Sequence, residues 1–559
     1  MDDAGRPGNL QHSISSISGS RILSGHLPPN VYTSPSKRRF GTGHRQELTA
    51  SILDNAHGFP YSRKLEAHKS CINALTFSSG DGRFLASGGD DLRILLWDFH
   101  QNDVKIPTHA LRGPKGNIFC LNFSATNRYI FSGGTCERIY QYDISALGTP
   151  MAHIEHAGSP DNIYRSHNES IRALACHPIQ DDIFMSASDD GSIIRHDIRE
   201  GTGRQTSTDN TIQAQCEVTG VQYHPTIEHL FASSDSSGRV LLHDARMAFG
   251  ARKERSEQGI VQRYNTKLTR RSSPRLSNPE SSSITFDKNG SKLAVTFLHY
   301  LPTIYAVSDP NPIAVLSGAN LPDGTPNPPN ERTYCNSCTM KHGSFGGPGL
   351  DTDDMFAGGS DDFRVYIWKI PPITQLTSQR REYSADQWIA SGLSVDSQTI
   401  AFTKGRDEPK VIPTEIATPF CRLTGHNSIV NTTIFHPYFL HVATSGVERN
   451  IILHSPTPSS PCTQNLQRSP ADVRQLNNDE DEHDRSNYLA AILSVGHSTV
   501  GDVDDESEAQ TLSLFDHIIR EEGVGDVFTY RHWTSSDSEE NSSNNPEEED
   551  SDPDSDMVQ

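Results

Sequence analysis

The sequence predicts an all-β protein in which seven copies of one β-rich unit stand around a central axis, as the blades of a propeller. The first observation is a phrase that recurs along the chain. It occurs at residues 84–98, 129–143, 183–197, 230–244, 355–369 and 440–454. The second observation is that a copy contains two short β-rich runs separated by turn residues, as FLASGG and ILLWD flank Asp90 and Asp91. Repetition at a period of about 40–50 residues indicates a repeat architecture.

A third β-rich run precedes the phrase and completes each unit. These runs read CINALTF, NIFCLNF, SIRALAC, VTGVQYH, SSITF, SCTMKHGSF and SIVNTTIF. The units begin near Leu65, Leu111, Ile163, Ala214, Ser281, Thr333 and Leu423, and the fifth is the least legible because it lacks the phrase. One unit cannot bury its apolar faces alone, whereas radially stacked units share a core and keep their edges short. We therefore expect one propeller over residues 58–456.

Polar residues at fixed places in the units have a structural explanation. The recurring phrase resembles the WD repeat, in which a His, a Ser, an Asp and a Trp form a hydrogen-bonded set that stiffens the blade. The resemblance assigns His68, Ser87, Asp91 and Trp97 to this set, and it gives like places in other blades to Asp190, Asp362, Trp368 and His426. A hydrolase triad is the alternative. It is disfavoured because these residues repeat once per unit, whereas an active site occurs once.

The charge of the chain is concentrated at one end. The formal net charge of −21 arises from 49 basic and 70 acidic residues, and residues 470–559 contain 25 of the acids and 4 of the bases. Residues 1–469 are therefore neutral overall. This argues against a DNA-binding surface that depends on an overall positive charge of the propeller region. Nucleic-acid binding through the basic insertion at 250–280 stays open as a local alternative.

The nine cysteines do not form a framework. Cys335 and Cys338 are the only CxxC pair, and zinc would require a second pair or histidines at ligand spacing, so we predict no metal and no cofactor. The chain has no apolar run of about 18 residues and no signal-peptide pattern at its start, so we predict no membrane association. Unpaired thiols are typical of a reducing compartment, which predicts the nucleus or the cytoplasm, or both.

The two tails outside the repeats, residues 1–57 and the acidic residues 457–559, are predicted to be mostly disordered. Within the propeller, residues 250–280 form a polar, basic insertion and residues 371–420 form another long connection. Insertions of this length are usually functional or unstructured. Residues 534–559 contain ten acids and no bases, so they cannot collapse into a core.

Short helices interrupt the predicted disorder. The C-terminal tail has one near residues 487–495 and one at 510–522, where Leu512, Phe515, Ile518 and Ile519 share a face. Two interpretations stay open. These helices pack on the propeller or on each other, or they bind a partner and become ordered on contact.

Two neighbouring units end in the same short pattern, Asp-x-Arg. The third unit ends with Asp197 and Arg199, and the fourth ends with Asp244 and Arg246. The strand places the Asp at a turn and the Arg two residues later at one rim of the propeller. A guanidinium offers five donors in a rigid fork that suits acidic or carbonyl groups on a partner. The structural alternative is that Asp caps the turn and Arg is a solvated rim residue.

This tandem pattern resembles the W-D-x-R box of WD-repeat substrate receptors of cullin-4 RING ubiquitin ligases. The wording is most similar to the fifth-numbered subfamily of the cullin-4-associated factors, notably in NSCTMK, SDDFRVYIWKIP and the tail stretch SLFDHIIREE. The chain departs from the box at His196 and His243, where the family has Trp. The fourth unit also has Ser237 where the set has its Asp.

The resemblance implies that Asp197, Arg199, Asp244 and Arg246 dock on the propeller-built adaptor subunit of the ligase. It also implies that a helix at 44–56, through Leu48, Ile52 and Leu53, could contribute to docking. We expect a non-catalytic receptor that presents an unknown protein substrate and meets the cullin-4 and RING proteins indirectly. The chain has no G-x-x-x-x-G-K-[ST], H-E-x-x-H or G-x-S-x-G motif, so we predict no enzyme. The alternative is a scaffold in a nuclear chromatin or RNA-handling complex with no ligase link.

Overall fold

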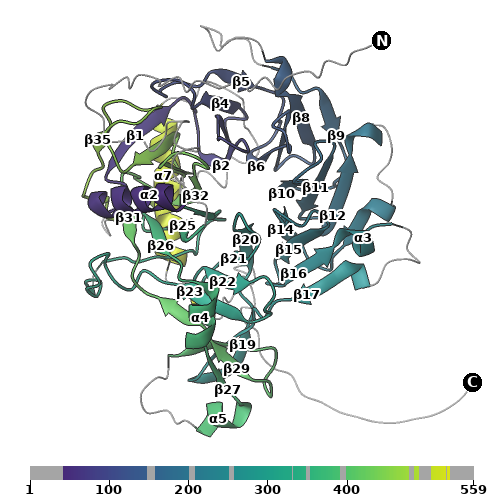
Figure 1. Ribbon diagram of the computed structural model, residues 1–559, viewed down its shortest axis with the longest axis vertical. Helices are drawn as coiled ribbons and strands as arrows, with labels where there is room; N and C mark the ends of the chain where they lie inside the picture. The colour runs from purple at the N-terminus through teal and green to yellow at the C-terminus, as the bar shows by residue number, and fades with distance from the viewer. Residues whose placement is uncertain are drawn as a thin grey trace, which may run out of the picture.

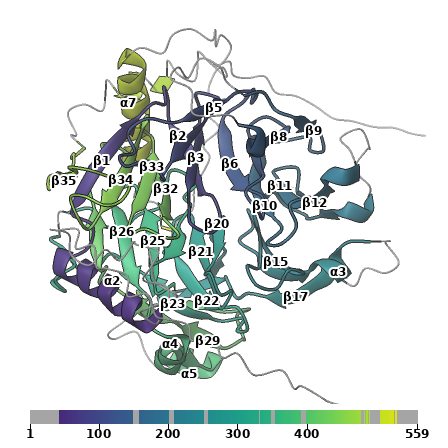
Figure 2. The same cartoon turned by 45° about the horizontal axis from the view of Figure 1, so that its top comes forward.

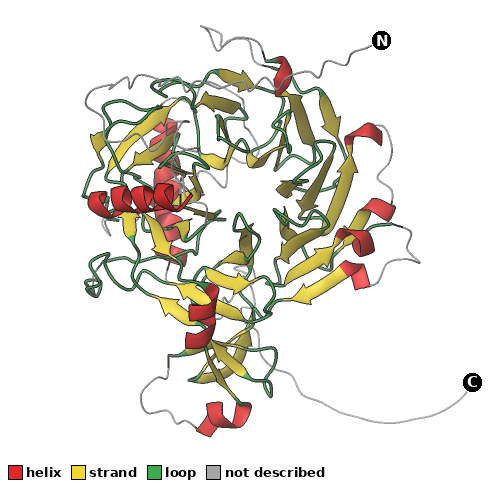
Figure 3. Cartoon of the chain, viewed as in Figure 1, coloured by secondary structure: helices red, strands yellow, loops and turns green. Residues whose placement is uncertain are grey.

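Seven β-sheets stand in a ring around a central axis, as predicted (Figure 1). The computed structural model describes residues 42–147, 158–200, 208–250, 257–329, 331–347, 353–390, 398–476, 505–523 and 526–528, together with a few positions between 482 and 489. The innermost strands of neighbouring sheets contact one another around the ring. Strands dominate the described residues, and helices lie at the periphery or on the two faces (Figure 3). The predicted disorder of residues 1–41 and 529–559 lies outside the described residues.

Each of the first four blades contains four antiparallel strands in chain order. The strands of blades one and two are β2 (Ile72–Phe77), β3 (Phe84–Gly89), β4 (Ile94–Asp98), β5 (His109–Leu111), β6 (Ile118–Phe123), β7 (Tyr129–Gly134), β8 (Ile139–Asp143) and β9 (Asn162–Tyr164). Those of blades three and four are β10 (Ile171–Cys176), β11 (Ile183–Ser188), β12 (Ser192–Asp197), β13 (Thr211–Gln213), β14 (Val218–Tyr223), β15 (Leu230–Asp235), β16 (Val240–Asp244) and β17 (Ile260–Arg263).

The remaining blades borrow strands from distant parts of the chain. Blade five has β20 (Ser281–Phe286), β21 (Lys292–Phe297), β22 (Thr303–Ala306) and β23 (Pro312–Leu316), with β30 (Thr414–Ile416) added in parallel to β23. Blade six has β24 (Ser344–Gly346), β25 (Met355–Gly359), β26 (Val365–Lys369) and β31 (Cys421–Leu423). Blade seven has β32 (Val430–Phe435), β33 (Val442–Gly446) and β34 (Asn450–Ser455), and it is completed by β1 (Tyr61–Glu66) and β35 (Gln467–Arg468).

Strand β1 closes the ring. Its register with β34 runs from the pair Tyr61 and Ser455 to the pair Glu66 and Asn450. Leu65, near which the sequence begins the first unit, is fully buried in this pairing and lies in the last blade instead. The sequence repeat therefore begins one strand earlier than the blade does. The offset joins the two ends of the propeller by main-chain hydrogen bonds.

A recurring glycine explains part of the repeated phrase. Gly89 ends β3 beside the start of β2, where the register shifts between Ile72 and Ala74. A Cβ atom on Gly89 would meet the carbonyl oxygen of Cys71 at 1.9 Å. Gly134 and Gly446 meet the same obstacle at 1.7 and 1.9 Å. The bulge at the inner strand thus leaves no room for a side chain at this position.

The two insertions form an eighth sheet, so our expectation that they are long connections is wrong for much of their length. Its order is β19 (Ser273–Ser277), β18 (Leu268–Arg270), β28 (Ile400–Phe402), β29 (Lys410–Ile412) and β27 (Arg381–Tyr383). It lies outside the ring beyond blade five, together with α4 (Ile373–Gln379) and α5 (Ala385–Ala390) (Figure 1). Leu268, Phe402 and Val411 form its core with Val315 of blade five. Strands of three to five residues are too short to show a periodic pattern in the sequence.

Two longer helices lie on opposite faces of the ring over blades six and seven (Figure 2). They are α2 (Thr42–Ala56) and α7 (Asp505–Glu522). Both were predicted, although each is longer than the sequence pattern indicated. Most of the predicted helix at 487–495 lies outside the described residues. No helix in the described part of the chain is long and apolar enough to cross a membrane.

Candidate partner-binding surfaces

The polar set of blade one has the geometry that the WD-repeat resemblance implies. His68 bonds through Nδ1 to Asp91 at 3.0 Å and through Nε2 to the Ser87 hydroxyl at 2.8 Å. The Trp97 indole donates to Ser87 Oγ at 3.0 Å. Burial would raise the pKa of Asp91, but the hydrogen bond from His68 and the charges of His68 and Arg93 hold it below its usual value. An ionised Asp91 therefore fixes the imidazole, which in turn orients the serine and the indole.

Blades three and seven contain corresponding sets with histidine in place of tryptophan, and blade seven also has threonine in place of serine and glutamate in place of aspartate. In blade three, His167 bonds to Asp190 and Ser186, and His196 bonds to Ser186 at 2.8 Å. In blade seven, the corresponding residues are His426, Glu448, Thr444 and His454. Burial lowers the pKa of His196 and of His454 to about 3. Sequence reasoning missed His167, Ser186, Thr444, Glu448 and His454, although the spacing of the polar set in blade one could have found them.

Blades four and six depart from the set. Gly358 stands where blade one has Ser87, so the indole of Trp368 donates to the carbonyl of Ser317 at 2.7 Å. Asp362 accepts from the Tyr366 hydroxyl at 2.6 Å and pairs with Arg364. In blade four, His243 bonds to Ser233 at 2.8 Å and to the carbonyl of Gln258 at 3.1 Å. The turn of blade four has Ser237 where the set has its Asp. Asp235 stabilises this turn instead, because it accepts hydrogen bonds from the backbone N–H and the Nε of Arg239.

The two Asp-x-Arg turns have nearly identical geometry. Asp197 accepts from the backbone N–H of Arg199 at 3.0 Å and from its Nε at 2.8 Å. Asp244 caps the short helix α3 (Ala245–Ala248) and accepts from the N–H of Arg246 at 2.9 Å and its Nε at 3.0 Å. The hydrogen bonds from the arginines lower the pKa of both carboxyls. Each Asp thus holds its guanidinium in one orientation, and the arginine side chains are 61% and 68% exposed.

Exposed apolar side chains accompany these arginines on the same face. In an antiparallel blade, the ends of the first and third strands lie at one edge. The turn after β10 carries Ile179, and the turn after β14 carries Ile227, which are 64% and 39% exposed. Met247, next to Arg246, is 44% exposed. Sequence reasoning missed these three residues because an isolated apolar residue in a turn carries no periodic signal.

The turns that carry the isoleucines are rigid. His177 Nδ1 accepts from the backbone N–H of Ile179 at 3.2 Å and of Gln180 at 3.1 Å. His224 Nδ1 accepts from the N–H of Ile227 at 3.0 Å. Burial lowers the pKa of both histidines, which keeps these nitrogens unprotonated and able to accept. We call the surface formed by Ile179, Arg199, Ile227, Arg246 and Met247 the rim patch.

Helix α2 lies on the face that carries the rim patch. Asp54 pairs at 2.8 Å with Lys369, which ends the third strand of blade six. Leu53 is fully buried against blades six and seven, whereas Leu48 and Ile52 are half-buried. Leu53 is therefore buried in an intramolecular contact, and its side chain is not available to an adaptor in this conformation.

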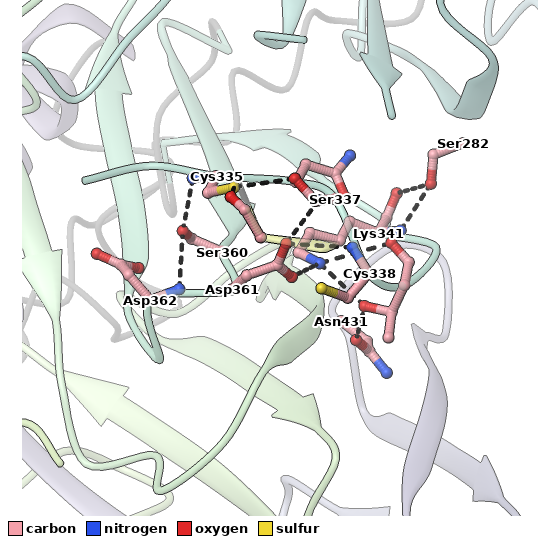
Figure 4. A network of polar contacts seen from close by, with 12 residues as sticks. Ser282, Cys335, Ser337, Cys338, Lys341, Ser360, Asp361, Asp362 and Asn431 are labelled. Atoms are coloured by element: carbon pink, nitrogen blue, oxygen red, sulfur yellow. Dashed lines mark hydrogen bonds and ion pairs between the residues drawn. The ribbon is translucent and has the colours of Figure 1, made fainter. Parts of the chain in front are cut away.

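The opposite face is organised by a buried ion pair, Lys341 with Asp361 (Figure 4). Asp361 also accepts from the backbone N–H of Ser337 at 2.6 Å and of Cys338 at 3.3 Å. Lys341 donates to the Thr339 hydroxyl at 2.9 Å. The two most specific stretches of the sequence, NSCTMK and SDDFRVYIWKIP, therefore belong to one network, in which an acid from the second folds the loop formed by the first.

A cavity of about 410 Å³ opens on this face at the mouth of the central channel. Its lining includes Asn73, Arg172, Thr339, Met340, Asn431 and Phe515. Phe515 comes from α7, so the C-terminal helix forms part of the wall of the mouth. We call this opening the channel mouth.

Cys335 and Cys338 lie in this network without forming a metal site. Among the described residues, no group of three or more His, Cys, Asp or Glu side chains could hold a metal ion. Burial raises the pKa of the Cys335 thiol, and its sulfur lies 3.1 Å from the Ser337 hydroxyl and 3.5 Å from the carbonyl of Gly523. A protonated, hydrogen-bonded thiol is a poor nucleophile.

The comparisons agree with this geometry. The family model described as "WD domain, G-beta repeat" matches residues 59–98 and 105–143. The chain contains WD repeats, and its fold is that of a WD-repeat propeller. Its matched segments run from the closing strand β1 through blade one and the body of blade two, and the other blades follow the same plan with divergent polar sets.

Relatives of this WD-repeat protein include DDB1- and CUL4-associated factor 5 of Mus musculus and of Homo sapiens. Each is 29% identical over 515 residues, which are 88% of this chain and 45% of the relative. The chain thus spans less than half the length of these relatives. Protein ALTERED SEED GERMINATION 2 of Arabidopsis thaliana is 33% identical over 143 residues, 25% of this chain and 18% of that protein. The predicted resemblance to the cullin-4-associated factors is confirmed.

Proposed function

We propose that this WD-repeat protein is a non-catalytic substrate receptor of a cullin-4 RING ubiquitin ligase, docked on the adaptor through the rim patch. The observation that carries the proposal is the pair of Asp-braced, exposed arginines on adjacent blades, Arg199 and Arg246. The similarity to DDB1- and CUL4-associated factor 5 supports it, since the name of that relative states an association with DDB1 and CUL4. The cullin and the RING protein would be met through the adaptor.

The composition of the rim patch suits a protein partner. Arginine and methionine are enriched at protein interfaces, and lysine and glutamate are depleted there. Each arginine is held before binding by its own aspartate, so less side-chain entropy is lost on contact. Within the described residues, Nη1 of Arg199 has no hydrogen bond and offers donors to a carbonyl or carboxylate.

The rim patch and the channel mouth lie on opposite faces of the propeller. A receptor docked through the rim patch keeps the channel-mouth face free for a protein substrate. The proposal places the receptor in the nucleus, the cytoplasm or both, where its adaptor would meet it. In this role the chain catalyses no step of ubiquitin transfer.

The test is co-precipitation of the tagged full chain with the adaptor, beside the variant Arg199→Glu/Arg246→Glu. The matched control is Arg83→Glu/Arg128→Glu, because these exposed arginines pair with Asp98 and Asp143 at the same edge of blades one and two. We expect capture by the wild type and the control, and loss of capture in the rim variant. Circular dichroism checks that each variant is folded.

Other outcomes separate the alternatives. No capture by the wild type would overturn the ligase role and favour the scaffold. Equal capture by the rim variant would keep the ligase role and move docking to another surface, with α2 as the first segment to test. Loss of capture in both double variants would show that charge on this face matters without specificity for the Asp-x-Arg turns.

A further inference from the structure

Helix α7 lies in a groove whose floor is formed by loops of three blades. The floor consists of Cys71 from blade one, Phe363 from blade six, and Ile429 and Val447 from blade seven. Each of these side chains is 7% exposed or less. They lie in connecting turns and not in the strand core, and Phe515 and Ile519 of α7 help to cover them, together with Cys338, Val473 and Leu476. Without it they would form an exposed apolar patch, which on a soluble protein usually marks a binding site.

The helix fills the groove with few residues. Ile519 is 4% exposed and packs on the floor, and Phe515 is half-buried and lines the channel mouth. In a folded protein, most of the stability of an amphipathic helix such as α7 comes from the packing of its apolar face. The floor of the groove therefore determines whether α7 is helical.

An ion pair fixes the register of the helix in the groove. Arg474 holds Asp516 with two hydrogen bonds of 2.6 Å each. The Nε atom of Arg474 donates to the carbonyl of Asn427 at 2.7 Å, and its guanidinium lies 4.9 Å from the ring centroid of Phe363. Arg474 is thus preorganised by the propeller to receive one carboxylate. Bidentate arginine–carboxylate pairs are directional as well as strong.

We propose that this groove is a helix-binding site for which α7 is the internal ligand, and that a partner helix of the same pattern displaces it. The pattern is an aromatic residue, an acid directly after it and an aliphatic residue four positions later, as in Phe515, Asp516 and Ile519. These positions meet, in turn, the channel mouth, Arg474 and the apolar floor. The inference does not depend on the ligase role, because it rests on contacts within this chain.

The tethered helix competes with any partner at an effective concentration on the order of millimolar. A free helix at micromolar concentration therefore binds the wild-type chain poorly, even when its contacts are the same. Weakening the tethered copy alone exposes the groove. This makes the proposal testable with the full chain and one peptide.

The probe is a labelled peptide of residues 505–523, and the proteins are full chains. Asp516→Arg places a second positive charge beside Arg474, and the repulsion between the two side chains releases the tethered helix. Glu521→Arg is the control, because it makes the same charge change at an exposed position of α7. We expect Asp516→Arg to capture the wild-type peptide at least about tenfold more tightly than the wild type or the control does. A peptide carrying Asp516→Arg should not be captured.

Hydrogen exchange over residues 505–522 reports whether the tethered helix is released. We expect faster exchange in Asp516→Arg and restored protection in Arg474→Glu/Asp516→Arg, where the ion pair is reversed. Phe515→Ser is a second way to open the groove without touching the ion pair. Unchanged exchange in both single variants would overturn the proposal, since other contacts would then hold α7. A released helix with no gain in peptide capture would overturn it as well, because the groove would then be a packing surface only.

Discussion

Lys341 and Asp361 form an ion pair in which neither side chain is more than 1% exposed. Asp361 binds the loop formed by residues 335–341, and the backbone N–H of Lys341 donates to Ser282 of blade five at 2.7 Å. The pair therefore connects blades five and six beside the channel mouth. Its hydrogen bonds explain why both ions tolerate removal from water.

We predict that Lys341→Met lowers the free energy of unfolding by about 3–5 kcal/mol, because it leaves the Asp361 carboxylate buried without its cation. Urea denaturation measures the change. Lys105→Met is the matched control, since Lys105 is 63% exposed and pairs with Asp103 at the surface. The control should change stability by less than about 1 kcal/mol. Equal losses in the two variants would contradict the structural role of the buried pair.

Buried histidines should make the propeller sensitive to mild acid. Burial lowers the pKa of His196 and His454 to about 3 and that of His243 and His441 to about 4, against an ordinary value of 6.5. The folded state leaves these rings neutral, whereas the unfolded chain protonates them below pH 6.5. Stability therefore falls as the pH drops from about 6.5 toward 4, by up to about 1.4 kcal/mol per pH unit for each ring.

The measurement is urea denaturation at several pH values between 7 and 5. His196→Gln should bind about one proton fewer on unfolding, which reduces the slope of stability against pH. The variant will also lose some stability at pH 7, because the amide replaces a ring stacked on Phe184 at 4.4 Å. An unaltered slope would show that His196 is protonated in the folded state.

The eighth sheet depends on one buried ammonium group. Lys410 Nζ lies within hydrogen-bonding distance of four acceptors and shares its three N–H groups among them: the Thr403 hydroxyl at 3.1 Å and the carbonyls of Gly405, Arg406 and Glu408 at 2.9, 2.8 and 2.6 Å. Lys410→Met leaves these acceptors without their shared donor, which costs about 1–3 kcal/mol. We expect faster hydrogen exchange in β28 and β29 with no change in blades one to four. Faster exchange throughout the ring would mean that the eighth sheet is not a separate unit.

Strand β1 should be necessary for a monomeric ring. A chain that starts at residue 67 leaves β34 with an open edge, and such edges pair with other chains. We expect oligomers in size-exclusion chromatography with light scattering. A chain that starts at residue 57 is the control, because it retains β1 and the buried Phe59 and lacks only α2 and the residues before it. A monomeric protein from the shorter chain would contradict the closing role of β1.

The ring was predictable because its signal is repeated. The turn residues and apolar runs recur in six of the seven units, so weak local evidence adds up along the chain. The polar sets were predictable in part: His68 and Asp91 follow the familiar pattern, whereas His196 and His454 stand at the position where that pattern has tryptophan.

Other features could not be read from the sequence. The eighth sheet pairs β18 with β28, whose residues are more than 100 positions apart, and single short strands do not reveal their partners. In blade six, the loss of the serine at Gly358 redirects the Trp368 indole to the backbone carbonyl of Ser317. The partner of Trp368 therefore depends on tertiary structure.

The pairing of Tyr61 with Ser455 has a consequence for how the protein is made. During vectorial synthesis, blades one to four can each assemble from neighbouring residues soon after they leave the ribosome. Strand β1 emerges before all of them but has no partner until residue 455 has been translated. The nascent chain must therefore carry an unpaired, partly apolar strand while the rest of the propeller is synthesised, which identifies the interval before ring closure as the time when it most needs protection by a chaperone.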